Sequence, residues 1–69
     1  MSTSTATYTV TGMTCGHCVQ SVTEEITELD GVQSVDVDLA SGAVTVVSTQ
    51  PLEESAVKAA VEEAGYQLA

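Results

Sequence analysis

Two cysteines, Cys15 and Cys18, lie in the stretch TCGHC with Gly16 and His17 between them, and they are the only cysteines among 69 residues. Cysteine thiolates bind soft metals, and they are also the nucleophiles of disulfide exchange. The stretch is therefore compatible with three kinds of site: a disulfide-exchange centre, one half of a zinc site, or a two-thiolate clamp for a soft metal ion. These few residues alone do not decide among the three.

The number of available ligands favours Cu(I). Structural zinc sites take four ligands, and iron–sulfur clusters commonly take four cysteines. This chain offers two thiolates and His17, which makes three ligands at most. Two thiolates suffice for Cu(I), a soft ion. We expect His17 to be an exposed residue that tunes its neighbours rather than a ligand, because a residue adjacent to one cysteine tends to point away from the thiolate pair.

The flanking pattern indicates how the two cysteines are positioned. Residues 6–11 alternate apolar and polar side chains, as a half-buried strand does. Residues 16–29 carry apolar side chains on one face of a helix, and Gly31 is expected to end that helix. Cys15 should then lie in the loop and Cys18 in the first helical turn. The amino end of a helix lowers thiol pKa values and so favours the thiolate form.

The remaining sequence predicts two more strands, a second helix and a short final strand. Residues 32–39 and 43–48 form a hairpin, residues 52–64 form a helix after Pro51, and residues 66–69 form the last strand. The order strand, helix, strand, strand, helix, strand predicts an α+β, ferredoxin-like βαββαβ sandwich. Its four-stranded antiparallel sheet would carry two helices on one face. We expect a single domain over residues 1–69, with residues 1–5 frayed.

The charge balance excludes some classes of partner. Ten acidic residues stand against one lysine, Lys58, and no arginine, so the net charge is −9. Nucleic acid binding needs lysine or arginine on the phosphates, so we expect no nucleic acid partner and no stable association with a membrane. The charge favours solubility, and it is also compatible with a basic protein partner. We see no secretory signal and no apolar run of ~18 residues, so we expect a cytoplasmic protein with reduced thiols.

The stretch GMTCGHC, after a strand and before a helix, resembles the GMxCxxC motif of the heavy-metal-associated domain family. The resemblance is close to small bacterial copper chaperones and extends through ELDGV, VDVDLASGAVTV and AVEEAGYQLA. It implies Cu(I) bound by Cys15 and Cys18, with Met13 as a buried anchor beneath the loop and Tyr66 near the metal loop. Zinc and cadmium relatives commonly carry an acidic residue in or beside the motif, where this chain has Thr14, and this difference favours copper.

These observations predict a cytosolic Cu(I) metallochaperone, not an enzyme. It would deliver copper by thiolate ligand exchange to a copper-transporting P-type ATPase or a copper-responsive regulator, in transient protein–protein complexes. We expect a monomer without metal, and a metal-bridged dimer is an alternative for the loaded protein.

Three alternatives remain open. CGHC is the active-site tetrapeptide of protein disulfide isomerase, which suggests a thiol–disulfide oxidoreductase. Against it, 69 residues are too few for the thioredoxin fold, no tryptophan precedes Cys15, and Pro51 is not placed to face the cysteines. The chain could also be a binding module for zinc or mercury, or an excised N-terminal domain of a metal-transporting ATPase.

Overall fold

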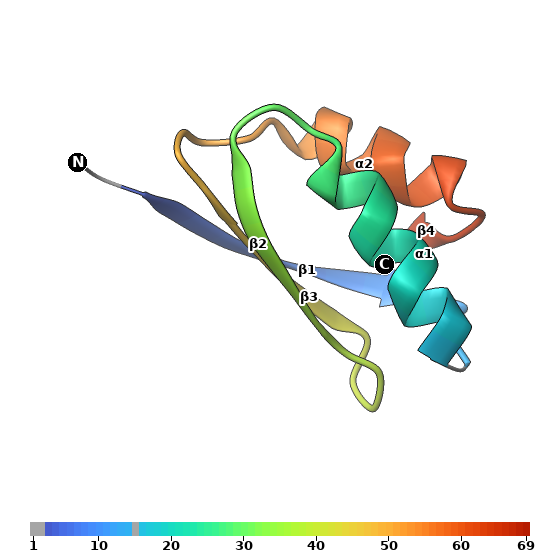
Figure 1. Cartoon of the computed structure of the whole chain (residues 1–69). Coiled ribbons are helices and arrows are strands. Elements are labelled where there is room, and N and C mark those ends of the chain that lie inside the picture. The colour runs from blue at the N-terminus through green and yellow to red at the C-terminus, as the bar shows by residue number, and fades with distance from the viewer. Residues whose placement is uncertain (1–2, 15) are drawn as a thin grey trace.

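The computed structural model describes residues 3–14 and 16–69, which form six elements in the predicted order. The strands pair in the order β2-β3-β1-β4, and all neighbouring strands are antiparallel. Figure 1 shows both helices on the same face of the sheet. The ferredoxin-like βαββαβ fold is therefore confirmed. The elements are β1 (Ser4–Thr11), α1 (Gly16–Thr27), β2 (Val32–Asp38), β3 (Ala43–Ser48), α2 (Glu54–Glu63) and β4 (Gln67–Leu68).

The core lies between the helices and the sheet and consists mainly of small aliphatic side chains. β1 and β3 alternate between buried and more exposed positions, as strands with one covered face do. Each helix contributes one apolar stripe to the same layer. Burial of this apolar area is the main force that holds the two layers together. The buried apolar residues are Val10, Val22, Ile26, Val44, Val46, Val57, Ala60 and Val61.

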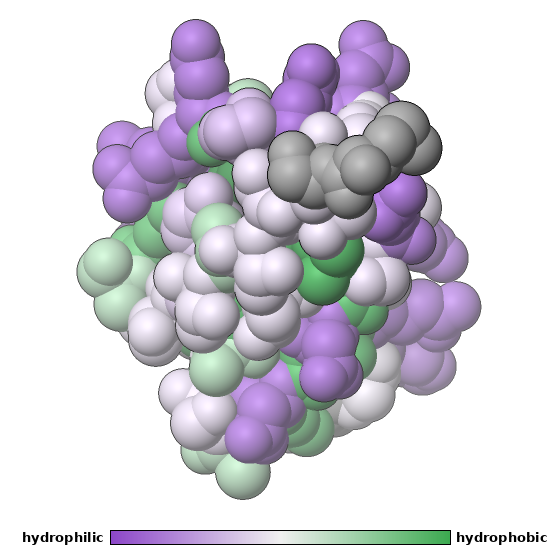
Figure 2. Space-filling model, turned by 90° about the vertical axis from the view of Figure 1, so that its left-hand side faces the viewer, coloured by the Kyte–Doolittle hydropathy of each residue, from purple (hydrophilic) through white to green (hydrophobic). Residues whose placement is uncertain are grey.

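The sheet face away from the helices is polar but carries little charge along β1. The outward positions of β1 from Thr5 to Thr11 are all threonine and all exposed. On the side of the molecule shown in Figure 2, residues of intermediate hydropathy occupy the centre, with hydrophobic residues beside them and strongly hydrophilic residues mainly above and below. Threonine suits this position because its branched side chain favours strands and its hydroxyl remains hydrated.

β1 begins earlier than the sequence predicts. Ser4 pairs with Ser48 and Thr5 pairs with Val47, so the expected fraying of residues 1–5 is wrong for these two residues. β3 continues far enough to offer them a hydrogen-bonding partner, and this pairing compensates for the polar character of their side chains. Residues 1 and 2 lie outside the described part of the chain.

Both helices are shorter than predicted. α1 ends at Thr27, whose hydroxyl donates a hydrogen bond to the Thr23 carbonyl at 2.6 Å, and Gly31 (φ 88°) lies in the turn before β2. α2 begins at Glu54 and not at residue 52, because Glu53 keeps an extended backbone as the N-cap after Pro51. Within residues 3–14 and 16–69, neither helix is long and apolar enough to cross a membrane.

The turn between β2 and β3 is anchored to β1. The Asp38 carboxylate accepts the Ala40 N–H at 3.0 Å, which closes the turn and leaves Leu39 outside the strand and 39% exposed, contrary to the prediction. Gly42 donates its N–H to the Asp38 carbonyl at 2.8 Å, and its own carbonyl accepts the Val10 N–H at 2.9 Å. The hairpin is thus hydrogen-bonded to the end of β1, three residues before Met13.

The end of α2 determines where the chain enters β4. Gly65 (φ 97°) donates its N–H to the Glu62 carbonyl at 2.9 Å, and Tyr66 donates to the Val61 carbonyl at 3.1 Å. These two bonds form a Schellman motif, which satisfies helix carbonyls that lack helical partners. The predicted helix stop at Gly65 is confirmed, although β4 covers only Gln67 and Leu68.

We predict that Gly42→Ala destabilises the domain more than Gly65→Ala does. Both glycines have positive φ, but a Cβ at Gly42 would lie 2.6 Å from the Val10 carbonyl oxygen, whereas nothing lies within 4 Å of a Cβ at Gly65. Gly65→Ala should cost about 1 kcal/mol from backbone strain alone, and Gly42→Ala at least about 2 kcal/mol. Urea denaturation measures both, and equal midpoints for the two variants would contradict the close approach of Gly42 to β1.

Candidate metal-binding site

The loop between β1 and α1 and the first turn of α1 carry the CxxC motif. β1 ends at Thr11, Gly12 (φ 92°) redirects the backbone, and α1 begins at Gly16. Cys18 is the third residue of α1, so its predicted place in the first helical turn is confirmed. Cys15 lies outside the described residues, and its predicted place in the loop stays a prediction.

The topology brings three connections to one end of the domain. β1 and β2 each pair antiparallel with β3, so they run in the same direction. The loop after β1 and the turn after β2 therefore lie at the same end of the sheet. The α2–β4 turn joins them there, because β4 begins opposite Thr11 and runs back along β1. Residues far apart in the sequence are thus available to surround the motif loop.

Cys18 is partly buried, and its thiol lies beside a hydroxyl. The Thr14 Oγ1 atom is 3.8 Å from the Cys18 Sγ atom. A thiolate has no proton to donate, so in the thiolate form the hydroxyl is the donor of this hydrogen bond. Backbone N–H groups and the helix dipole add positive potential at the same place. Together these features stabilise negative charge on the Cys18 sulfur.

Sequence reasoning missed this contact. In the sequence, Thr14 is notable only because it is not acidic, yet its hydroxyl is a side-chain partner of Cys18. The spacing of four residues was the available signal, since such spacing brings side chains together along a helix. Thr14 precedes the helix, however, so the spacing alone does not establish the contact.

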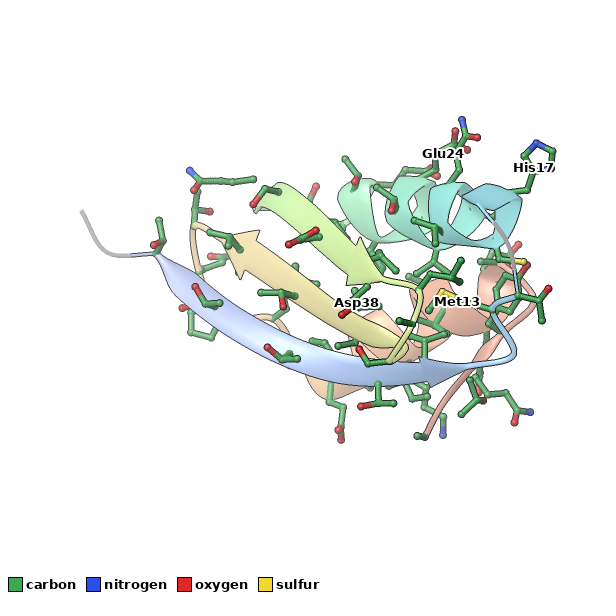
Figure 3. All side chains as sticks on the ribbon, turned by 90° about the horizontal axis from the view of Figure 1, so that it is seen from below. Met13, His17, Glu24 and Asp38 are labelled. Atoms are coloured by element: carbon green, nitrogen blue, oxygen red, sulfur yellow. The ribbon has the colours of Figure 1, made fainter. Side chains whose placement is uncertain are left out.

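Met13 points into the domain. Its side chain is partly buried and packs against the buried core. Figure 3 shows Met13 directed inward between the sheet and the helices. This position is suited to an anchor beneath the loop, because methionine fills irregular gaps in an apolar layer.

His17 points in the opposite direction. It is exposed, and Figure 3 shows its ring extending from α1 away from the domain. In the described part of the chain, no three histidine, cysteine, aspartate or glutamate side chains gather in a group suited to a metal ion. Within residues 3–14 and 16–69, Cys18 therefore belongs to no such group of three.

Tyr66 lies against the motif loop from the other side. The turn that ends α2 positions this residue, and its side chain is partly buried on the core. A Cβ built on Gly12 would be 3.4 Å from Cδ1 of the Tyr66 ring. The ring is therefore packed on the backbone that leads into the motif, as the sequence led us to expect.

Comparison with known proteins supports the same architecture. The family model described as the heavy-metal-associated domain matches residues 7–67. The chain is 40% identical over 60 residues to the copper chaperone CopZ of Staphylococcus aureus, a match that covers 86% of this chain and 88% of CopZ. It is 37% identical over 65 residues to human copper-transporting ATPase 2, covering 93% of this chain but only 4% of that protein.

A solved structure extends the similarity to three dimensions. The protein described as a CopZ metallochaperone superposes with a TM-score of 0.87 at 37% identity, covering 96% of this chain and 100% of the other. The family match spans nearly the whole chain and includes the strand, loop and helix that carry the CxxC motif. The chain belongs to the heavy-metal-associated domain family.

Proposed function

We propose that this chain is a cytosolic Cu(I) metallochaperone, a carrier of copper and not an enzyme. Cys15 and Cys18 would hold the ion. The observation that carries the proposal is the position of Cys18, beside the exposed loop in the first turn of α1 and within a CxxC pair. The similarity to a protein named copper chaperone supports copper as the cargo.

The chemistry of the residues fits a monovalent soft ion. Two thiolates and one Cu(I) carry a net charge of −1, and the amino end of α1 offers positive potential to that charge. Copper binding releases the thiol protons, because thiolates and not thiols are the ligands. In this proposal Met13 anchors the loop from below, Tyr66 packs on its backbone, and His17 tunes the thiolates without binding the ion.

Copper transfer would proceed by ligand exchange without a change in oxidation state. A partner thiol loses its proton and donates a sulfur electron pair to Cu(I), which gives a three-coordinate ion shared by both proteins. One chaperone sulfur then leaves, and a second partner thiol loses its proton and takes its place on the ion. The second chaperone sulfur leaves last, so Cu(I) ends on two partner thiolates, and the two released chaperone thiolates take up the two protons. Cys15, which precedes the helix, would exchange first, while Cys18 belongs to the first turn of α1.

We propose a copper-transporting P-type ATPase or a copper-responsive regulator as the recipient. Human copper-transporting ATPase 2 contains a segment similar to 93% of this chain. A recipient with a domain of this kind could meet the chaperone through matching motif loops. The complex must be transient, because the carrier has to be released after delivery.

The fold disfavours the thiol–disulfide oxidoreductase. In this chain, Pro51 lies in the connection from β3 to α2. That connection begins at the end of β3 that is remote from the β2–β3 turn. The turn after β2 and the start of α1 lie at the opposite end of the sheet, so Pro51 is remote from Cys18. Metal-bridged dimers and modules for zinc or mercury use the same two thiolates, and metal titration distinguishes them from a Cu(I) carrier.

We predict that the double variant Cys15→Ser, Cys18→Ser loses Cu(I) binding. The affinity of the reduced protein should fall by more than the roughly 10–100-fold effect of removing a group outside the ligand set. Competition with a colorimetric Cu(I) chelator under anaerobic conditions measures the change. A double variant that binds Cu(I) as tightly as the unmodified chain would refute the proposed function.

We predict that His17→Ala changes the Cu(I) affinity by no more than about twofold, because its ring points away from the domain. The same chelator competition measures the affinity, and the double cysteine variant gives the range expected for loss of a ligand. A decrease in Cu(I) affinity as large as that of the double cysteine variant would show that His17 is a ligand.

We predict that Thr14→Val weakens Cu(I) binding about fivefold, since a single hydrogen bond contributes ~1 kcal/mol. Valine keeps the shape of threonine but lacks the hydroxyl that lies near the Cys18 sulfur. Thr14→Ser is the matched control, because it keeps the hydroxyl and should retain most of the affinity. Equal weakening in both variants would show that the methyl group matters and the hydroxyl does not.

A further inference from the structure

One edge of the sheet is open along most of β1. β4 pairs only with Val10 and Thr11, and Ala69 adds one hydrogen bond from its N–H to the Thr9 carbonyl at 2.8 Å. Among the residues that the structure describes, no strand pairs with residues 4–8 on this side. More than half of β1 therefore forms a free edge next to the short β4.

The backbone groups at this edge are arranged to accept another strand. Successive residues of an antiparallel strand direct their N–H and C=O groups to opposite sides. Val10 bonds to Gly42 on the hairpin side, whereas the Thr9 carbonyl bonds to Ala69 on the β4 side. By this alternation Thr5 and Thr7 direct their N–H and C=O groups toward the free edge.

The two outer edges of the sheet differ in how they are protected. Natural proteins protect exposed edges with charged side chains, proline or β-bulges. β2, at the opposite edge, carries Asp36 and Asp38 and has a register irregularity between Val32 and Ser34. β1 reads STATYTVT and has no charge, no proline and no such irregularity. Its free edge thus lacks these three protections.

A groove lies where the free edge meets the end of β4. Its volume is about 270 Å³, and it opens in the line that β4 would follow if it continued along β1. Pockets for small molecules are usually larger, ~300–1,000 Å³, and mainly apolar. This smaller groove, lined in part by residues of β1 and β4, suits a polypeptide segment better. Its lining residues are Thr7, Tyr8, Thr9, Glu54, Leu68 and Ala69.

The charge around the groove determines the kind of segment that fits. Glu54 lines the groove, Glu53 is the residue before Glu54, and the whole chain carries a net charge of −9. A second copy of this chain would bring another −9 and another Glu54 to the same place. Opposite charges favour association and like charges oppose it, so the fitting segment is basic.

We propose that the free edge of β1 binds an extended basic segment of a partner protein as an added antiparallel strand. Main-chain hydrogen bonds to Thr5 and Thr7 would provide affinity, as in other cases of strand addition. Residues directly opposite each other share one face of a sheet, so the partner residues opposite Ala6 and Tyr8 would face the helices. Lysine or arginine at these positions would approach Glu54. This surface is separate from the CxxC motif.

Peptide titration of the full-length, isotope-labelled chain tests the proposal. The probe is an eight-residue peptide of alternating threonine and lysine. We expect its binding to shift the Thr5 and Thr7 amide resonances and to slow Thr7 amide exchange by about tenfold at saturation. The control is the same peptide with N-methylated threonines, which keeps the charge but removes the edge hydrogen bonds. It should bind at least about tenfold more weakly.

Two charge variants distinguish peptide binding at the groove from general attraction of a basic peptide to an acidic protein. Glu54→Gln should weaken the lysine peptide about two- to fivefold, the range of an exposed ion pair. Glu63→Gln removes the same charge at the other end of α2 and should leave binding unchanged. Thr7→Pro removes the edge N–H and should abolish binding, while the N-methylated peptide tests the same bonds on an unmodified protein.

Three results would overturn the proposal. Equal binding of the N-methylated and unmodified peptides would show attraction by charge alone. Equal weakening by Glu54→Gln and Glu63→Gln would place the peptide elsewhere on the acidic surface. Sedimentation showing dimers of the metal-free chain, with Thr7 protected from exchange in the absence of peptide, would make a second copy the occupant of the edge.

Discussion

The end of β1 is held on both sides, and the position of the motif loop depends on this constraint. Val10 is buried in the core, its N–H binds the Gly42 carbonyl, and it pairs across the sheet with Leu68. The hairpin and the last strand therefore fix one short segment from opposite directions. The chain leaves the sheet two residues later, so the loop that carries the cysteines starts from a rigid point.

The motif loop combines a fixed support with an accessible surface. Met13 packs inward on the core, and Tyr66 packs on the backbone at Gly12. His17 points outward from the same short segment. Both properties suit the proposed carrier, since the ion would be held in a defined geometry and still be reached by a partner. The amino end of α1 adds positive potential without adding a ligand.

The negative charge of the chain has different consequences near the CxxC motif and at the free edge of β1. Near Cys18, the amino end of α1 and the Thr14 hydroxyl favour negative charge on the sulfur. At the β1 edge, no strand charge opposes pairing, and Glu54 selects the sign of an incoming segment. A protein with one lysine and ten acidic residues can thus attract basic partners at a place separate from its CxxC motif.

The sequence by itself determined the order of elements, the apolar faces and the CxxC motif at a helix start. These features depend on residue spacing along the chain, because strands and helices have fixed periods. The C-terminal stop of α2 at Gly65 was predictable for the same reason, since a positive φ there favours glycine.

Only the tertiary structure decided the features that depend on distant partners. The order of residues did not reveal that β3 would pair with Ser4 and Thr5, or that the Asp38 turn would leave Leu39 exposed. The contact of Thr14 with Cys18 depends on how the loop enters α1. The free edge of β1 exists because β4 is only two residues long, and the turn after α2 determines that β4 begins opposite Thr11. Local periodicity determines which face of an element is apolar, but backbone partners across the fold determine where each element begins and ends.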